Sequence, residues 1–197
     1  MSQRKELLCF TIGHSILPLS KFLKFLAVYS INCIIDVRSI PYLKYAAQFN
    51  REYLESELKQ KGIRYLFMGN ILGTKYEDAD LKFEDGKVDY AKVRKTKGFE
   101  GGVGKIIDEI KRGAVIAIMC SEKEPFLCHR FVSVSYSLSM QGINVQHILK
   151  DGSLCSQGEL EDRLFKQCKP VYEKTTKHEA LEQAYCEHGK HVTCDSN

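Results

Sequence analysis

The segment from Cys120 to Arg130 holds the densest group of reactive side chains in the chain. It combines two thiols, a carboxylate, an imidazole and a guanidinium, at Cys120, Glu122, Cys128, His129 and Arg130. A thiol at a helix N-terminus faces unpaired backbone N–H groups, and a neighbouring guanidinium favours its thiolate. The same position suits a phosphate or carboxylate, which Arg130 can contact with both arms of its fork. His129 could transfer a proton near neutral pH, and Glu122 could orient it or act as a base. Equally, both cysteines could be small buried core residues.

A second group follows the first apolar run of the sequence, at Gly13-His14-Ser15. Gly13 lets backbone approach a ligand closely, and His14 and Ser15 could then contact that ligand. Alternatively, Ser15 serves only as the N-cap of the next helix.

A third group follows the second apolar run, at Asp36-Val37-Arg38-Ser39. We expect Arg38 and Ser39 to contact a ligand and Asp36 to act as a structural anchor.

Short apolar runs separated by helix-like segments should position these residues. Strands are expected at 7–12, 33–37, 63–68, 114–119 and 143–148. Helices are expected after Pro18, from Asn50 to Lys61, and over 102–112, 131–141 and 157–167. This order predicts a single α/β domain over 1–168, a mainly parallel sheet with helices on both faces in a three-layer, Rossmann-like arrangement. In such sheets ligands bind outside the carboxyl ends of the strands, where all three groups fall.

Two stretches do not fit the alternation. Residues 69–101 are expected to form a long polar loop, and 169–197 a C-terminal tail with a weak apolar pattern, partly disordered.

Composition limits the classes of function. Lys and Arg total 29 and Asp and Glu total 25, so the net charge is +4. Such a mild excess permits an anionic ligand but does not indicate a protein coated with nucleic acid. The apolar run Leu7–Ile12 is too short for a secretory signal, and we expect no membrane partner. A cytoplasmic location is expected, with the cysteines reduced.

The sequence predicts neither a metal nor a cofactor. Seven residues separate Cys120 from Cys128, which is not a known zinc spacing, and the chain has no CxxC pair. Four C-terminal residues have the right types for zinc in a cramped spacing, namely Cys186, His188, His191 and Cys194. No GxGxxG follows the first strand, and the glycine-rich segment Gly101–Lys105 fails the phosphate-loop pattern.

Taken together, the motifs resemble a bacterial and archaeal family called domain of unknown function 488. They are Thr11-Ile12-Gly13-His14-Ser15, Asp36-Val37-Arg38-Ser39-Ile40-Pro41, Phe49-Asn50, Leu72-Gly73, Cys120-x-Glu122…Cys128-His129-Arg130 and the closing strand Asn144–Ile148. The resemblance covers about Leu7 to Ile148 and implies a fold and a site rather than an activity. Thr74 departs from the family pattern, which more often has a second glycine there.

Three functions remain open. The chain could be an enzyme acting on a phosphate-containing or nucleotide or nucleic-acid-related ligand. It could be a thiol enzyme that uses Cys120 or Cys128, since the segment loosely resembles the active-site loop of rhodanese-type sulfurtransferases and cysteine phosphatases. It could also be an anion-binding module without catalysis. The catalytic candidates are His14, Glu122, His129, Cys128 and Cys120, and the ligand-binding candidates are Gly13, Ser15, Arg38, Ser39 and Arg130.

Overall fold

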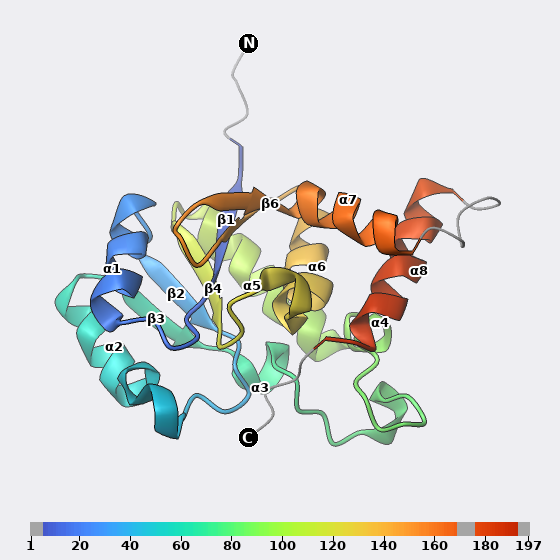
Figure 1. Cartoon of the computed structure of the whole chain (residues 1–197), viewed down its shortest axis with the longest axis horizontal. Helices are drawn as coiled ribbons and strands as arrows, with labels where there is room; N and C mark the ends of the chain where they lie inside the picture. Colours follow the sequence, from blue (N-terminus) through green and yellow to red (C-terminus); the bar gives the residue numbers. More distant parts are fainter. Residues whose placement is uncertain (1–5, 169–175, 193–197) are drawn as a thin grey trace, which may run out of the picture.

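A six-stranded sheet forms the centre of the computed structural model, which describes residues 6–168 and 176–192 (Figure 1). The strand order is β3-β2-β4-β1-β5-β6. The strands are β1 (Leu8–Gly13), β2 (Cys33–Asp36), β3 (Arg64–Phe67), β4 (Ile116–Cys120), β5 (Asn144–Ile148) and β6 (Leu154–Ser156). The first five pair in parallel and β6 pairs antiparallel with β5. The sheet is thus mainly parallel, as predicted, and β6 is an addition that the sequence pattern did not reveal.

Helices cover both faces of the sheet, which confirms the predicted α/β fold. Side chains alternate along each strand, so Phe10 and Ile34 pack with the helices α1 (Leu19–Val28) and α2 (Arg51–Gln60). The alternate residues Cys9 and Ile35 pack on the opposite face with α5 (Lys97–Lys111) and α6 (Tyr136–Ser139). A short helix, η1 (Lys44–Phe49), joins β2 to α2.

The segment expected to be a long polar loop is largely folded. It contains the short helices α3 (Gly69–Leu72), η2 (Ala79–Leu81) and α4 (Tyr90–Val93), and α5 begins at Lys97 instead of residue 102. Thr96 caps α5, because its hydroxyl accepts from the backbone N–H of Phe99. Gly102 weakened the helical pattern, but a Cβ there would lie 2.9 Å from Leu72 Cδ2. The glycine therefore lets α3 and α5 approach closely.

The helix expected over 131–141 begins with a wider turn. Phe131–Ser135 (η4) is π-helical, and α6 continues from it. Pro125–Leu127 forms a short 3-10 turn, η3, just before this helix. Such π-helical turns are often found at functional sites.

The C-terminal segment contains a helix that the apolar pattern did not predict. Residues 157–167 form α7, as expected, and Lys177–Gly189 form α8, with a capping box between Thr176 and Glu179. Tyr185 of α8 is fully buried in the core, while Ala180 and Ala184 bury only small side chains. Because α8 has few large apolar side chains, the spacing of apolar residues did not predict this helix. Residues 169–175 and 193–197, with Cys194 of the cramped Cys/His group, lie outside the described residues. Within the described part, none of the helices is long and apolar enough to span a membrane.

Candidate functional site

The loops that follow β1 and β4 run side by side beyond the sheet. The backbone N–H of His14 donates to the Cys120 carbonyl (3.0 Å), and that of Ser15 donates to the Ser121 carbonyl (2.9 Å). A Cβ on Gly13 would lie 1.9 Å from the Glu122 carbonyl oxygen. Gly13 is therefore needed for the close approach of the neighbouring loop. Ser15 has a φ of 44° and is not a helix N-cap, because α1 begins only at Leu19.

These two loops meet at a topological switch point. Although β1 and β4 are neighbours, the chain leaves β1 towards β2 and leaves β4 towards β5, in opposite directions across the sheet. The helices that follow, α1 and α6, accordingly pack on opposite faces. Open α/β sheets bind their ligands at such a point, outside the carboxyl ends of the strands. The two loops that carry most of the candidate residues therefore lie where this fold forms ligand sites.

Arg130 lies beneath the loop that follows β4. Its side chain is fully buried, and its Nε donates to the Thr11 hydroxyl (3.3 Å). Nη1 donates to the Glu122 carbonyl, and Nη2 donates to the Lys123 carbonyl (3.4 Å). All three acceptors are neutral oxygens. The guanidinium thus holds the loop by its backbone and carries a buried positive charge.

Arg38 is buried as well, but in an ion pair. Its Nη2 lies 2.6 Å from a carboxylate oxygen of Asp36, and the same nitrogen donates to the Phe49 carbonyl (2.9 Å). Its Nε also donates to Asp36 (3.0 Å), which accepts in addition from the Tyr65 hydroxyl (2.6 Å). Asp36 is thus the anchor that the sequence suggested. Arg38, which we expected to contact a ligand, is held by partners within the protein.

His14 completes this buried group. Arg38 Nη1 donates to His14 Nε2 (3.0 Å), and His14 Nδ1 donates to the Ser15 carbonyl (2.8 Å). Burial, and then the charge of Arg38, lower the pKa of His14 to about 3. The imidazole is therefore neutral at pH 7, and its lone pair is already engaged. It is stacked on the Phe49 ring, 4.2 Å away. This arrangement suits a positioning group rather than a proton carrier.

Ser39 organises the neighbouring loop at the end of β2. Its Oγ accepts from the backbone N–H groups of Thr74 (2.6 Å) and Lys75 (3.2 Å). The Thr74 hydroxyl lies 3.2 Å from the same oxygen. At the position where the family more often has glycine, Thr74 is thus buried against Ser39.

Glu122 is the acidic candidate with partial exposure to solvent. One of its carboxylate oxygens accepts from the backbone N–H of Glu124 (2.9 Å), which stabilises the turn of the loop. Glu124 itself pairs with Arg163 at the surface (3.3 Å). The Glu122 carboxylate is therefore partly exposed at this edge of the sheet.

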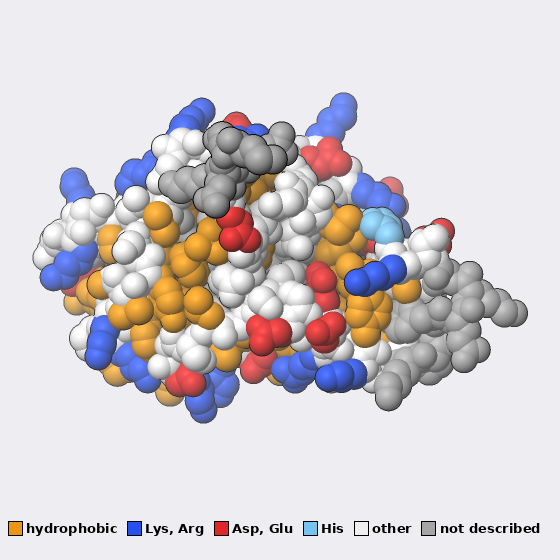
Figure 2. Space-filling model, turned by 90° about the horizontal axis from the view of Figure 1, so that it is seen from above, with side chains coloured by type: hydrophobic (Ala, Val, Ile, Leu, Met, Phe, Trp, Pro, Cys, Tyr) orange, Lys and Arg blue, Asp and Glu red, His pale blue; other side chains and the backbone are white. Residues whose placement is uncertain are grey.

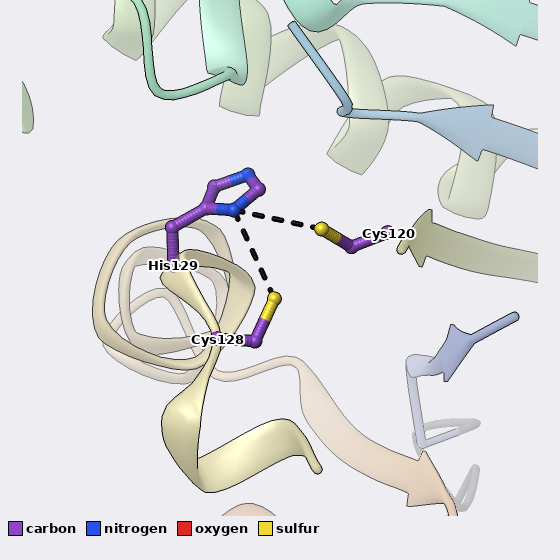
Figure 3. Close-up of side chains that lie close together, drawn as sticks. All are labelled: Cys120, Cys128 and His129. Carbon is purple, nitrogen blue, oxygen red and sulfur yellow. Dashed lines mark hydrogen bonds between the residues drawn. The ribbon is translucent and has the colours of Figure 1, made fainter. Parts of the chain in front are cut away.

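Cys120, Cys128 and His129 form a compact buried cluster (Figure 3). His129 Nδ1 lies 3.6 Å from Cys120 Sγ and 3.8 Å from Cys128 Sγ. The contact with Cys128, followed by burial, raises the pKa of the Cys120 thiol well above its ordinary value. Catalytic thiols are partly exposed and have lowered pKa values. Both features argue against Cys120 as a nucleophile, and Cys128 is equally buried.

A chain of buried hydrogen bonds links Arg130 to the C-terminal helix, and we call it the core relay. Besides Arg130, its members are Thr11, His147, Gln157, Tyr185 and Glu161. Each member donates to the next, because Arg130 and Glu161 fix the direction at the two ends. The link from Thr11 Oγ1 to His147 Nδ1 measures 2.8 Å. None of the other members was among the candidate site residues, since the hydrogen bonds join residues up to 136 positions apart.

Residues 18–137 match the family described as Domain of unknown function DUF488. The match covers more than half of the chain, so the chain belongs to this family. The resemblance inferred from the motifs is therefore confirmed. The matched region includes Arg38, Ser39 and the whole segment from Cys120 to Arg130, but not Gly13, His14 or Ser15. The chain matches none of the curated proteins compared with it.

Proposed function

We propose that this chain is an enzyme that binds a small phosphate-containing or nucleotide-related anion at the switch point between β1 and β4. The observation that carries the proposal is the fully buried guanidinium of Arg130, whose hydrogen bonds go to neutral oxygens. A buried charge is costly unless an opposite charge compensates it. Asp36 compensates Arg38, whereas an anion would compensate Arg130.

The neighbouring imidazoles neither neutralise the charge of Arg130 nor add to it. The lowered pKa values of His14 and His147, both about 3, keep these two imidazoles neutral. An anion that displaced the Glu122 and Lys123 carbonyls could form a forked contact with Arg130, which is stronger than the contacts it replaced. The loop between Cys120 and Arg130 would then act as the cover of the site.

The charge distribution favours a small ligand over a long nucleic acid. The net charge of the chain is only +4, and even on the face seen in Figure 2, which lies away from the carboxyl ends of β1 and β4, acidic side chains lie among the basic ones. A long nucleic acid requires a continuous basic surface. Glu122 is the acid–base group in this proposal, since its carboxylate is partly exposed. His14 and Arg38 position the loop after β1, which contacts the loop that carries Glu122.

Binding measurements with two variants test the anion site. Inorganic phosphate and a nucleoside 5′-monophosphate are titrated by calorimetry into the wild type, Arg130→Gln and Arg163→Gln. Arg163 is the matched control, because it lies against the same loop but is half exposed. We expect saturable binding that Arg130→Gln weakens by about 10- to 100-fold, the equivalent of one charged hydrogen bond. Arg163→Gln should change it by less than about twofold.

Two results would overturn the binding proposal: equal affinity in Arg130→Gln and the wild type, or no binding of either probe. Arg130→Lys keeps the positive charge but loses the forked contact. It provides a second measurement of the site if Arg130→Gln does not fold. Glu122→Gln tests catalysis, with an expected loss of turnover on a panel of phosphate esters and unchanged binding. If the wild type binds the probes but turns over no ester, the chain is a binding module and not an enzyme.

A further inference from the structure

We infer that Cys120, Cys128 and His129 form a site for a divalent zinc-like metal ion, held by two thiolates and one imidazole. Cys120 ends β4, and the other two residues precede the π-helical turn on the same face of the sheet. Figure 3 shows both sulfur atoms and His129 Nδ1 directed into one common space. The three ligand atoms all lie within 4.8 Å of one another.

The distances between these atoms agree with tetrahedral coordination. With zinc–sulfur bonds of about 2.3 Å and zinc–nitrogen bonds of about 2.0 Å, a tetrahedron places nitrogen and sulfur about 3.5 Å apart. The corresponding distances from His129 Nδ1 are 3.6 Å to Cys120 and 3.8 Å to Cys128. The two sulfur atoms lie within 4.8 Å of each other, where a tetrahedron places them about 3.8 Å apart, so an ion requires a shift of these side chains by no more than about 1 Å.

The bonding capacity of His129 Nδ1 favours a metal ion between the three atoms over hydrogen bonds to both sulfur atoms. An imidazole nitrogen carries either one proton or one lone pair, so Nδ1 can form only one strong hydrogen bond in the ring plane. Here two sulfur atoms share it at nearly equal distances. A metal ion at the centre accepts electron pairs from all three atoms at once.

Charge balance also favours a divalent ion. Binding releases one proton from each thiol to solvent, and the resulting two thiolates neutralise the metal, with no change of oxidation state. The affinity should therefore rise with pH. Three protein ligands also leave one coordination position open, as in catalytic rather than closed structural zinc sites.

The two proposals share the segment from Cys120 to Arg130, but the metal site does not rest on the anion site, and its test reads the metal directly. The reduced full-length protein is freed of metal with a chelator and then titrated with Co²⁺. We expect one Co²⁺ per chain, the visible bands of a tetrahedral ion, and a near-ultraviolet thiolate-to-cobalt charge-transfer band that Zn²⁺ abolishes. Cys120→Ser and Cys128→Ser should weaken this band and lower the affinity at least tenfold.

Cys186→Ser is the matched control, because it removes a cysteine of the C-terminal Cys/His group and should leave the spectrum unchanged. X-ray absorption of the wild-type zinc protein provides a readout that does not depend on folding of the variants. It should show two sulfur ligands and at least one nitrogen ligand. The inference is overturned if the reduced protein binds no Co²⁺ at micromolar concentrations. It is also overturned if Cys186→Ser, and not Cys120→Ser or Cys128→Ser, abolishes the cobalt band. A third contrary result is X-ray absorption that shows no sulfur ligand.

Discussion

The buried ion pair between Asp36 and Arg38 allows its free energy to be estimated from the structure. Asp36→Asn keeps the shape of the side chain but removes its charge. Asp36 accepts hydrogen bonds from the Arg38 backbone N–H, from its Nε and Nη2, and from the Tyr65 hydroxyl. The asparagine amide nitrogen would face these donors, so about two charge-assisted hydrogen bonds of roughly 1.5–3 kcal/mol each are lost. We therefore expect a loss of about 3–5 kcal/mol, as is usual when one partner of a buried pair is removed.

The assay is urea unfolding of four proteins: the wild type, Asp36→Asn, Arg38→Met and the double variant. Because Arg38→Met removes the uncompensated cation, the double variant should be more stable than the sum of the single changes predicts, by at least about 2 kcal/mol. Glu187→Gln is the control. Glu187 pairs with Lys190 at the surface of α8, where loss of an ion pair costs less than about 1 kcal/mol. A loss below about 1 kcal/mol for Asp36→Asn, or additive free energies, would refute the reasoning.

Three further predictions concern other buried groups. Gly13→Ala should cost at least about 2 kcal/mol in urea unfolding, because the new methyl group would overlap a backbone carbonyl of the neighbouring loop; wild-type stability would contradict this. Burial holds the pKa of His14 and His147 at about 3, so the unfolded state binds more protons as the pH falls from 6.5 towards 3. The free energy of unfolding should therefore decrease, as the pH falls, by up to about 1.4 kcal/mol per pH unit for each imidazole. A free energy of unfolding that stays constant between pH 6.5 and 4.5 would contradict the lowered pKa values. Tyr185→Phe removes the hydroxyl that joins α7 to α8 and should cost about 1–3 kcal/mol by thermal or urea unfolding, whereas an unchanged value would show that the core relay adds little.

Local patterns predicted most of the sheet and the positions of the loops that carry the candidate residues. Apolar runs such as Ala114–Met119 are long and uninterrupted because parallel strands are buried on both faces, so their positions are readable without the structure. The carboxyl ends of those strands then located the loops at Gly13, Arg38 and Cys120. The short strand β6 and the helix α8 carry few large apolar residues, which is why periodicity missed them.

The partners of the site residues could not be predicted in the same way. Arg38 and Arg130 have identical chemistry in the sequence, yet one pairs with a carboxylate and the other with carbonyl groups. That difference depends on contacts across the fold rather than on spacing. The sequence placed Cys120, Cys128 and His129 in one segment but could not show that their ligand atoms meet, because that depends on the turn at η3, which brings Cys128 back to the end of β4.

The position of β1 determines where this protein can be divided. Although β1 precedes the region that matches the family, it lies between β4 and β5. A fragment of residues 18–137 would retain β3, β2 and β4 but expose one full edge of β4 as a row of unpaired amide and carbonyl groups. Such an edge pairs readily with other chains and promotes aggregation. The smallest unit with a complete central sheet therefore extends from before Leu8 to beyond β5, and boundaries chosen from the family match alone would yield an insoluble product.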